Sequence, residues 1–152
     1  MDVSDLGEFG LIERLRRALP PAAPDRLIVG IGDDAAVWRS GDGYTVATTD
    51  TMVAGVHFLP GAVAWRDVGW KALATNISDI AAMGATPAFA LVTLCLPSDT
   101  NVEDIDALYT GLRECADVYG VTVALTGDAA SMRTASRCCY AATRRVPAIS
   151  SP

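Results

Sequence analysis

The sequence lacks the features that mark membrane, secreted and nucleic-acid-binding proteins. No apolar run approaches the roughly 20 residues of a membrane-spanning helix. Residues 1–5 lack the basic and apolar regions of a signal peptide. The net charge is −6 and no block of Lys and Arg is present, which argues against binding to a nucleic-acid backbone. We therefore expect a cytoplasmic protein with neither a membrane nor a nucleic acid among its partners.

Two common kinds of site are also missing. The chain has four cysteines, Cys95, Cys115, Cys138 and Cys139. They do not have the C-x-x-C spacing that is typical of a metal site. Cys95 and Cys115 fall at positions typical of a core, so we expect buried thiols in a reducing compartment. The chain has no G-x-x-x-x-G-K-[ST] segment, so any phosphate is bound without a Walker loop.

The chain has enough apolar residues for one folded domain. Its 152 residues are 51% hydrophobic, which suffices for a substantial core. A helical stripe includes Phe9 and Leu15, and Thr100 with Glu103 has the spacing of a capping box. Periodicity predicts helices near 9–19, 65–83 and 100–119 and strands at 27–31, 44–49, 88–96 and 121–126, with a weak strand near 138–143.

This order of elements predicts an α+β fold. We expect a mixed β-sheet with helices packed on one face. The other face then needs a cover, and we expect a dimer partner or a further domain to provide it.

Acidic residues recur where elements end. Asp33 and Asp34 lie in a glycine-rich loop, Asp50 follows a β-branched run, Asp79 lies near the end of a helix and Asp128 follows Gly127. Two of these positions have an ordinary alternative: Asp50 alone is typical of a turn, and Asn76 with Asp79 is typical of a solvated helix face. A carboxylate at a helix C-terminus is disfavoured by the helix dipole unless a cation compensates.

Several carboxylates that converge repel one another unless cations lie between them. Mg²⁺ prefers oxygen ligands and keeps several waters, so few protein ligands suffice when substrate phosphates supply the rest. Phosphoryl transfer is the chemistry that most often uses such a cluster, and a metal-dependent hydrolase is the nearest alternative. From the residues alone we predict a Mg²⁺-dependent enzyme that acts on phosphates.

Four motifs make the interpretation more specific. They are LGEFGLI at 6–12, GIGDDAAV at 30–37, TTDTMVAGVHF at 48–58 and WKALATNISDIAAMG at 70–84. In this order they resemble the N-terminal half of the thiamine-monophosphate kinases, in the aminoimidazole ribonucleotide synthetase-like superfamily. The match departs from the family at Thr126 and Ala129, which flank Gly127-Asp128.

The resemblance implies transfer of the γ-phosphoryl group of ATP to thiamine monophosphate, with Mg²⁺ ions, by a homodimer. It implies catalytic roles for Asp50 and Asp79, substrate binding by His57, and nucleotide contacts from Gly127, Asp128 and Tyr109. His57, the only histidine, would otherwise be interpreted as a hydrogen-bonded residue at an apolar edge, and Tyr109 as a core residue. The implied metal ligands are Asp33, Asp34, Thr48, Thr49, Asp50, Asp79 and Asp128.

The resemblance also implies a domain division. We expect residues 1–128 to form the metal-binding, nucleotide-binding and dimerising domain, and residues 129–152 to form a divergent or truncated tail. The family's C-terminal domain is expected to be absent. A non-catalytic dimerising fragment that binds Mg²⁺-nucleotide, and a superfamily member with another phosphate acceptor, are the alternatives.

Overall fold

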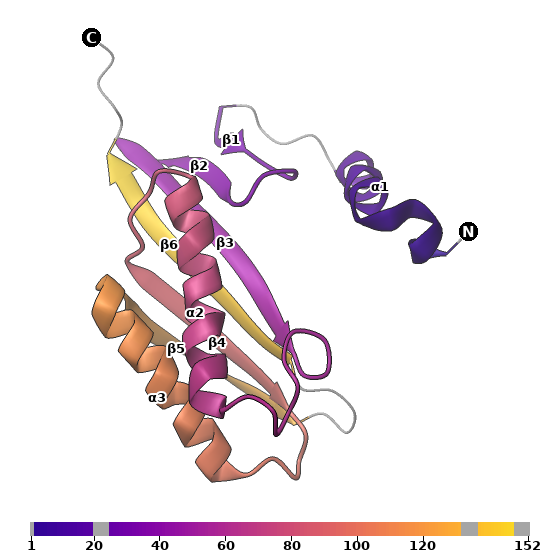
Figure 1. The fold of residues 1–152 in the computed structure, drawn as a ribbon. Helices are drawn as coiled ribbons and strands as arrows, with labels where there is room; N and C mark the ends of the chain where they lie inside the picture. Colours follow the sequence, from indigo (N-terminus) through magenta and orange to yellow (C-terminus); the bar gives the residue numbers. More distant parts are fainter. Residues whose placement is uncertain (1, 20–24, 132–136, 148–152) are drawn as a thin grey trace.

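The fold is a six-stranded mixed sheet with two long helices on one face (Figure 1). The computed structural model describes residues 2–19, 25–131 and 137–147, with side chains up to residue 124. The predicted fold class is confirmed. None of the helices in these ranges is long and apolar enough to cross a membrane.

The strand order in the sheet is β1-β2-β3-β6-β4-β5. Only β4 and β5 pair in parallel, and every other neighbouring pair is antiparallel. The last strand in sequence therefore lies near the centre of the sheet. The bounds are β1 Leu27–Val29, β2 Ala36–Ser40, β3 Gly43–Val53, β4 Phe89–Leu96, β5 Thr122–Ser131 and β6 Arg137–Pro147.

Helices α2 (Trp65–Ala82) and α3 (Val102–Tyr119) pack against each other over the sheet. Two glycines permit an unusually close approach. A Cβ atom added at Gly69 would lie 1.9 Å from the backbone oxygen of Leu108. One added at Gly111 would lie 1.7 Å from the backbone oxygen of Arg66. The predicted apolar stripe of α2 forms part of the core beneath, where Leu73 and Ile80 are fully buried.

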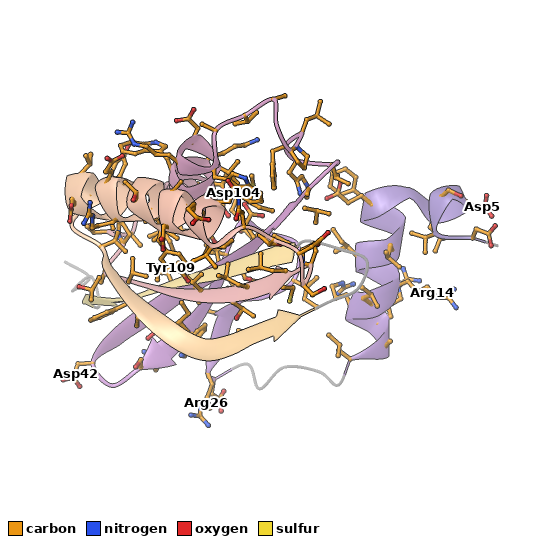
Figure 2. The ribbon with its side chains drawn as sticks, turned by 90° about the horizontal axis from the view of Figure 1, so that it is seen from below. Asp5, Arg14, Arg26, Asp42, Asp104 and Tyr109 are labelled. Atoms are coloured by element: carbon orange, nitrogen blue, oxygen red, sulfur yellow. The ribbon has the colours of Figure 1, made fainter. Side chains whose placement is uncertain are left out.

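Helix α1 (Val3–Ala18) differs from the prediction in its packing. It begins before the predicted start, has a kink at Gly7, and buries none of its residues. Phe9 of the predicted apolar stripe is 85% exposed. Figures 1 and 2 show the helix lying beside the sheet and away from α2 and α3. The helical periodicity therefore predicted the helix correctly, but it did not predict which of its side chains are buried.

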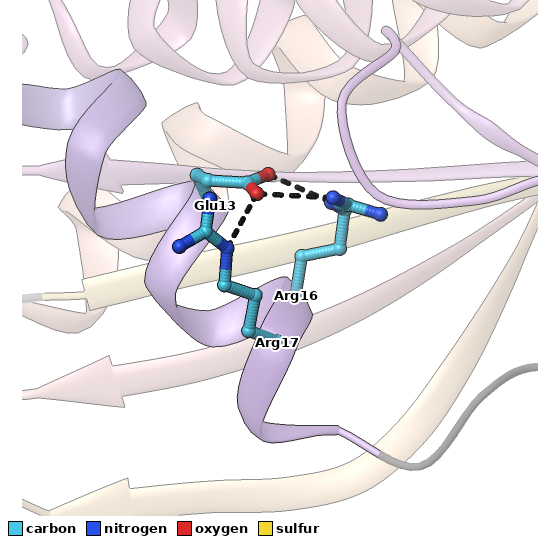
Figure 3. Close-up of polar contacts among 3 residues, drawn as sticks. All are labelled: Glu13, Arg16 and Arg17. Atoms are coloured by element: carbon cyan, nitrogen blue, oxygen red, sulfur yellow. Dashed lines mark hydrogen bonds and ion pairs between the residues drawn. The ribbon is translucent and has the colours of Figure 1, made fainter.

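A local ion-pair cluster lies on α1 (Figure 3). Glu13 accepts hydrogen bonds at 2.7 Å from both Arg16 Nε and Arg17 Nε. These two arginines lower the pKa of Glu13 to about 2. Pairs at this spacing support an exposed helix by small amounts.

Three local predictions were wrong. The capping box does not form, because Thr100 donates to the backbone oxygen of Pro97 at 2.8 Å and Asn101 is the N-cap residue. Strand β2 was not predicted, because the adjacent glycines and aspartates indicated a loop. Strand β3 does not end at Thr49 but continues to Val53, because β6 pairs with it along its whole length.

Candidate metal and phosphate site

The candidate site lies between β3 and α2. Successive side chains on a strand point to opposite faces. Val46, Thr48 and Met52 are buried toward the helices, so Asp50 lies on this same face of β3. The side chain of Thr49 is exposed on the opposite face. The structure therefore brings Thr48 and Asp50 to one side and leaves the Thr49 side chain away from them.

The Thr48 hydroxyl links three elements. Its Oγ1 lies 2.9 Å from Asp79 Oδ2 on α2 and 3.0 Å from the backbone oxygen of Asp34. A hydroxyl has a single hydrogen, so it donates to only one of these two oxygens at a time. When it donates to the Asp34 oxygen, the short contact with Asp79 Oδ2 needs a proton on Asp79. The arrangement thus concentrates oxygen atoms beyond what the available hydrogens satisfy.

The electrostatics of the cluster favour a cation. Burial raises the pKa of Asp79, the hydrogen bond from Thr48 lowers it in part, and the charges of Asp50 and Asp34 raise it further. These carboxylates come from three separate segments of the chain, and the charges of Asp50 and Asp34 repel that of Asp79. A cation placed among them would relieve this repulsion.

The spacing suits an ion that keeps water ligands. Within the side chains that the structure describes, no three His, Cys, Asp or Glu residues converge closely enough to hold a metal together. Mg²⁺ commonly binds through one or two carboxylates with waters and substrate phosphates. The residues present, Asp34, Thr48, Asp50 and Asp79, fit that mode of binding and not a closed protein cage.

Asp33 has a different environment from Asp34. Its Oδ1 accepts the backbone N–H of Asp34 at 2.9 Å, which fixes the turn that begins at Gly32. Gly32 has a φ of +115°, a conformation that favours glycine. The structure therefore places Asp34 with the cluster and gives Asp33 a contact within its own loop.

Gly127 and Asp128 lie in an irregular part of β5. Val92 on β4 pairs with Leu125, and Leu94 pairs with Ala129, so residues 126–128 lie opposite the single residue Thr93. This is a β-bulge, a device that is common beside active sites. The strand continues through the bulge to Ser131, whereas the sequence predicted that it would end at Thr126. The Asp128 side chain lies outside those described.

Tyr109 is removed from the carboxylates. It packs against the core and, with Leu112, Arg113 and Val123, lines a pocket of about 190 Å³ between α3 and β5. β5 is three strands from β3 in the sheet, or roughly 14 Å at about 4.8 Å per strand. The structure thus supports the core-packing interpretation of Tyr109 and does not bring it beside Asp50.

His57 lies on an exposed loop directly after β3. The ring atom Nδ1 accepts the backbone N–H of Val53 at 2.9 Å, and the backbone N–H of His57 donates to the backbone oxygen of Val53 at 2.8 Å. The following residue, Phe58, is buried and meets Trp65 edge to face at 5.5 Å. The ring is therefore held at an apolar edge, and in its neutral form it carries its proton on Nε2.

Two residues of α2 gain importance only from the structure. Asn76 is fully buried, so the interpretation of a solvated helix face is wrong at this position. Its Nδ2 donates to the Ala72 oxygen, but its Oδ1 has no hydrogen-bond partner in the described structure. Lys71 donates from Nζ to the backbone oxygen of His57 at 3.2 Å. An amide among apolar residues, one helical turn before Asp79, was the available signal for Asn76.

Comparisons with known proteins agree with this architecture. The profile described as AIR synthase related protein, N-terminal domain, matches residues 32–143. Thiamine-monophosphate kinase of Bacillus subtilis is 42% identical over 128 residues, which are 83% of this chain and 38% of that protein. Its counterpart in Escherichia coli is 47% identical over 123 residues, or 80% of this chain and 37% of the relative.

A solved structure described as AaThiL complexed with AMPPCP and TMP superposes with a TM-score of 0.80 at 32% identity. The match covers 97% of this chain and 46% of that one. The chain thus spans less than half the length of these relatives. The profile match over residues 32–143, which include α2, α3 and most of the sheet, shows that the chain belongs to the AIR synthase related proteins and corresponds to their N-terminal domain.

Proposed function

We propose that this chain is the N-terminal half of a thiamine-monophosphate kinase, which transfers the γ-phosphoryl group of ATP to thiamine monophosphate with the aid of Mg²⁺. The observation that carries the proposal is the Thr48 hydroxyl, which joins Asp79 to the Asp34 loop beside Asp50. The similarity to thiamine-monophosphate kinases and the AMPPCP and TMP of the AaThiL complex support the choice of substrates.

In this proposal Asp34, Asp50 and Asp79 hold Mg²⁺ ions through one or two carboxylates each, with waters and substrate phosphates as the other ligands and the Thr48 hydroxyl as a further oxygen in the cluster. Bound Mg²⁺ supplies charge neutralisation on the phosphates. Asp33, the Thr49 backbone and Asp128 remain candidate ligands from the family motifs. Gly127 and Asp128 at the bulge are proposed to approach the nucleotide, as is Tyr109 from its pocket.

The acceptor is proposed to bind at the His57 loop. Because Nδ1 of His57 is occupied by the Val53 N–H, Nε2–H is the ring donor available to a phosphate oxygen. An oxygen of the acceptor phosphate attacks the γ-phosphorus of ATP, the bond from that phosphorus to the bridging oxygen of ADP breaks, and thiamine diphosphate and ADP result. The protein's part is positioning and charge compensation, as in other phosphoryl transfers.

We further infer a homodimer through the uncovered face of the sheet. On β4 the residues facing the helices are buried, whereas Phe89 and Leu91 on the other face are 53% and 39% exposed. Apolar side chains on an open sheet face favour pairing with another surface. Light scattering should give twice the chain mass, and Phe89→Asp should reduce it to the monomer.

The kinase proposal is tested in a chimera. The 128 aligned residues of the Bacillus subtilis relative are replaced by those of this chain, so that the remainder of the relative completes the enzyme. The chimera should form thiamine diphosphate from ATP and thiamine monophosphate, and Asp50→Asn should abolish this. A folded chimera that binds nucleotide but forms no product, beside an active parent enzyme, would contradict the proposal.

A further inference from the structure

We propose that Lys71 binds the phosphate of the acceptor together with His57, a role that rests on the proposed kinase function. The sequence contains one lysine and one histidine, with arginine as every other basic residue, and the chain has a net charge of −6. These two single residues meet in the structure, where Lys71 Nζ lies 3.2 Å from the His57 backbone oxygen.

The loop that follows β3 carries His57, and the exposed Lys71 lies beside it on α2. Residues 53–58 are closed by Val53–His57 hydrogen bonds and by Gly55 N–H to the Phe58 oxygen at 2.7 Å. Gly55 has a φ of +79°, so the turn uses a conformation that favours glycine. Phe58 anchors the loop to the core next to Trp65 at the start of α2. The exposed His57 is therefore held on a rigid support.

The unused hydrogen-bond donors identify an anion as the ligand. The Lys71 ammonium has three N–H donors, and the His57 oxygen engages one of them. The neutral His57 ring adds Nε2–H, for which the described residues provide no acceptor. Donors of this kind, with one full positive charge, suit the several oxygens of a phosphate monoester.

The pair lies at a useful distance from the carboxylate cluster. Val53, which holds the His57 ring, is three residues after Asp50, or roughly 10 Å along β3. Lys71 is eight residues before Asp79, or roughly 12 Å along α2. The same strand and helix thus carry a cationic end and an anionic end. We assign the cationic end to the acceptor phosphate and the anionic end to the metal-bound nucleotide.

Binding to the 152-residue chain tests this assignment without turnover. The single histidine gives one set of imidazole NMR signals, so a titration reports directly on His57. Thiamine monophosphate should shift these signals, whereas thiamine, which lacks the phosphate, should not. Lys71→Met should weaken thiamine monophosphate binding roughly tenfold, the value of one charge-assisted hydrogen bond, and Lys71→Arg should restore most of it. Inorganic phosphate that binds as tightly as the ester would reduce the site to a general anion site and overturn the assignment.

Kinetics of the chimera separate this inference from the kinase proposal. Lys71→Met should raise the KM for thiamine monophosphate roughly tenfold and leave the KM for ATP and kcat nearly unchanged. Arg66→Met is the matched control, because Arg66 lies on the same helix but pairs with Glu114 at 2.8 Å. An active chimera in which Lys71→Met leaves the KM for thiamine monophosphate unchanged, or raises both KM values equally, overturns the role of Lys71. An inactive chimera beside a chain that still binds the ester through Lys71 overturns only the kinase proposal.

Discussion

Thr48 Oγ1 lies 2.9 Å from Asp79 Oδ2, although 31 residues separate them in sequence. This contact joins the end of α2 to β3. It also places a partly buried carboxylate beside two others, so that Asp79 is the residue whose ionisation the fold disfavours most clearly in the cluster.

Asp79→Asn should stabilise the metal-free protein at neutral pH. The pKa of Asp79 is raised above its usual range, so the folded state binds its proton more strongly than the unfolded state. The resulting contribution to stability is fully present below the unfolded pKa, near 3.9, and is lost as pH rises through the folded pKa. In thermal unfolding with EDTA, the melting temperature of the wild type should show this loss of stability between acid and neutral pH. The corresponding loss in the variant should be smaller. Equal pH dependence in the two proteins would contradict the account.

Mg²⁺ should raise the melting temperature of the wild-type chain. A ligand that binds only the folded state at a hundred times its Kd adds about 2.7 kcal/mol to the free energy of unfolding. Asp50→Asn and Asp79→Asn should each remove most of the increase, because each deletes a carboxylate from the cluster. Asp104→Asn, on α3 and outside the cluster, is the control and should keep the increase. The same increase in all four proteins would show binding elsewhere.

Gly69→Ala and Gly111→Ala should each destabilise the protein strongly. The new Cβ atom would meet a backbone oxygen at less than 2 Å in either case, so the helices must separate. Overpacking of this kind costs about 1–3 kcal/mol and occasionally more. Gly10→Ala on α1 is the control, because its Cβ atom would meet Leu6 at 3.4 Å, an ordinary contact. Urea denaturation should give a lower midpoint for the first two variants and no decrease for the third.

Asn76→Leu should leave stability unchanged or raise it. The Asn76 side chain is fully buried with an unsatisfied Oδ1, and such a group costs about 1–3 kcal/mol when nothing bonds to it. Leucine has the same number of side-chain heavy atoms and removes both polar atoms. A marked loss of stability in chemical denaturation would show that a water or another group satisfies Oδ1 in solution.

The sequence predicted the elements whose determinants are local. Leu73, Ile77 and Ile80 recur at helical spacing and are buried on α2 as expected. The capping box failed because Thr100 has a nearer acceptor in Pro97, a competition that spacing does not reveal. The exposed Phe9 shows that an apolar stripe indicates a helix without indicating what covers it.

The candidate site depends on non-local pairing, which the sequence predicted less well. The acidic motifs identified Asp34, Asp50 and Asp79, and their proximity follows from the packing of α2 on β3. Strand alternation separates Thr49 from Thr48, a consequence visible once β3 was known to extend through Asp50. The contact between Lys71 and His57 spans 14 residues and a loop closed by backbone hydrogen bonds, so no short motif contains it.

The fate of the γ-phosphate tests the central claim most directly. The chimera is given γ-labelled ATP and Mg²⁺, with and without thiamine monophosphate, beside its Asp50→Asn variant. The account predicts label in thiamine diphosphate when the acceptor is present, little release of free phosphate without it, and neither product in the variant. Label that appears as free phosphate at the same rate with or without thiamine monophosphate would contradict the account and indicate a metal-dependent hydrolase.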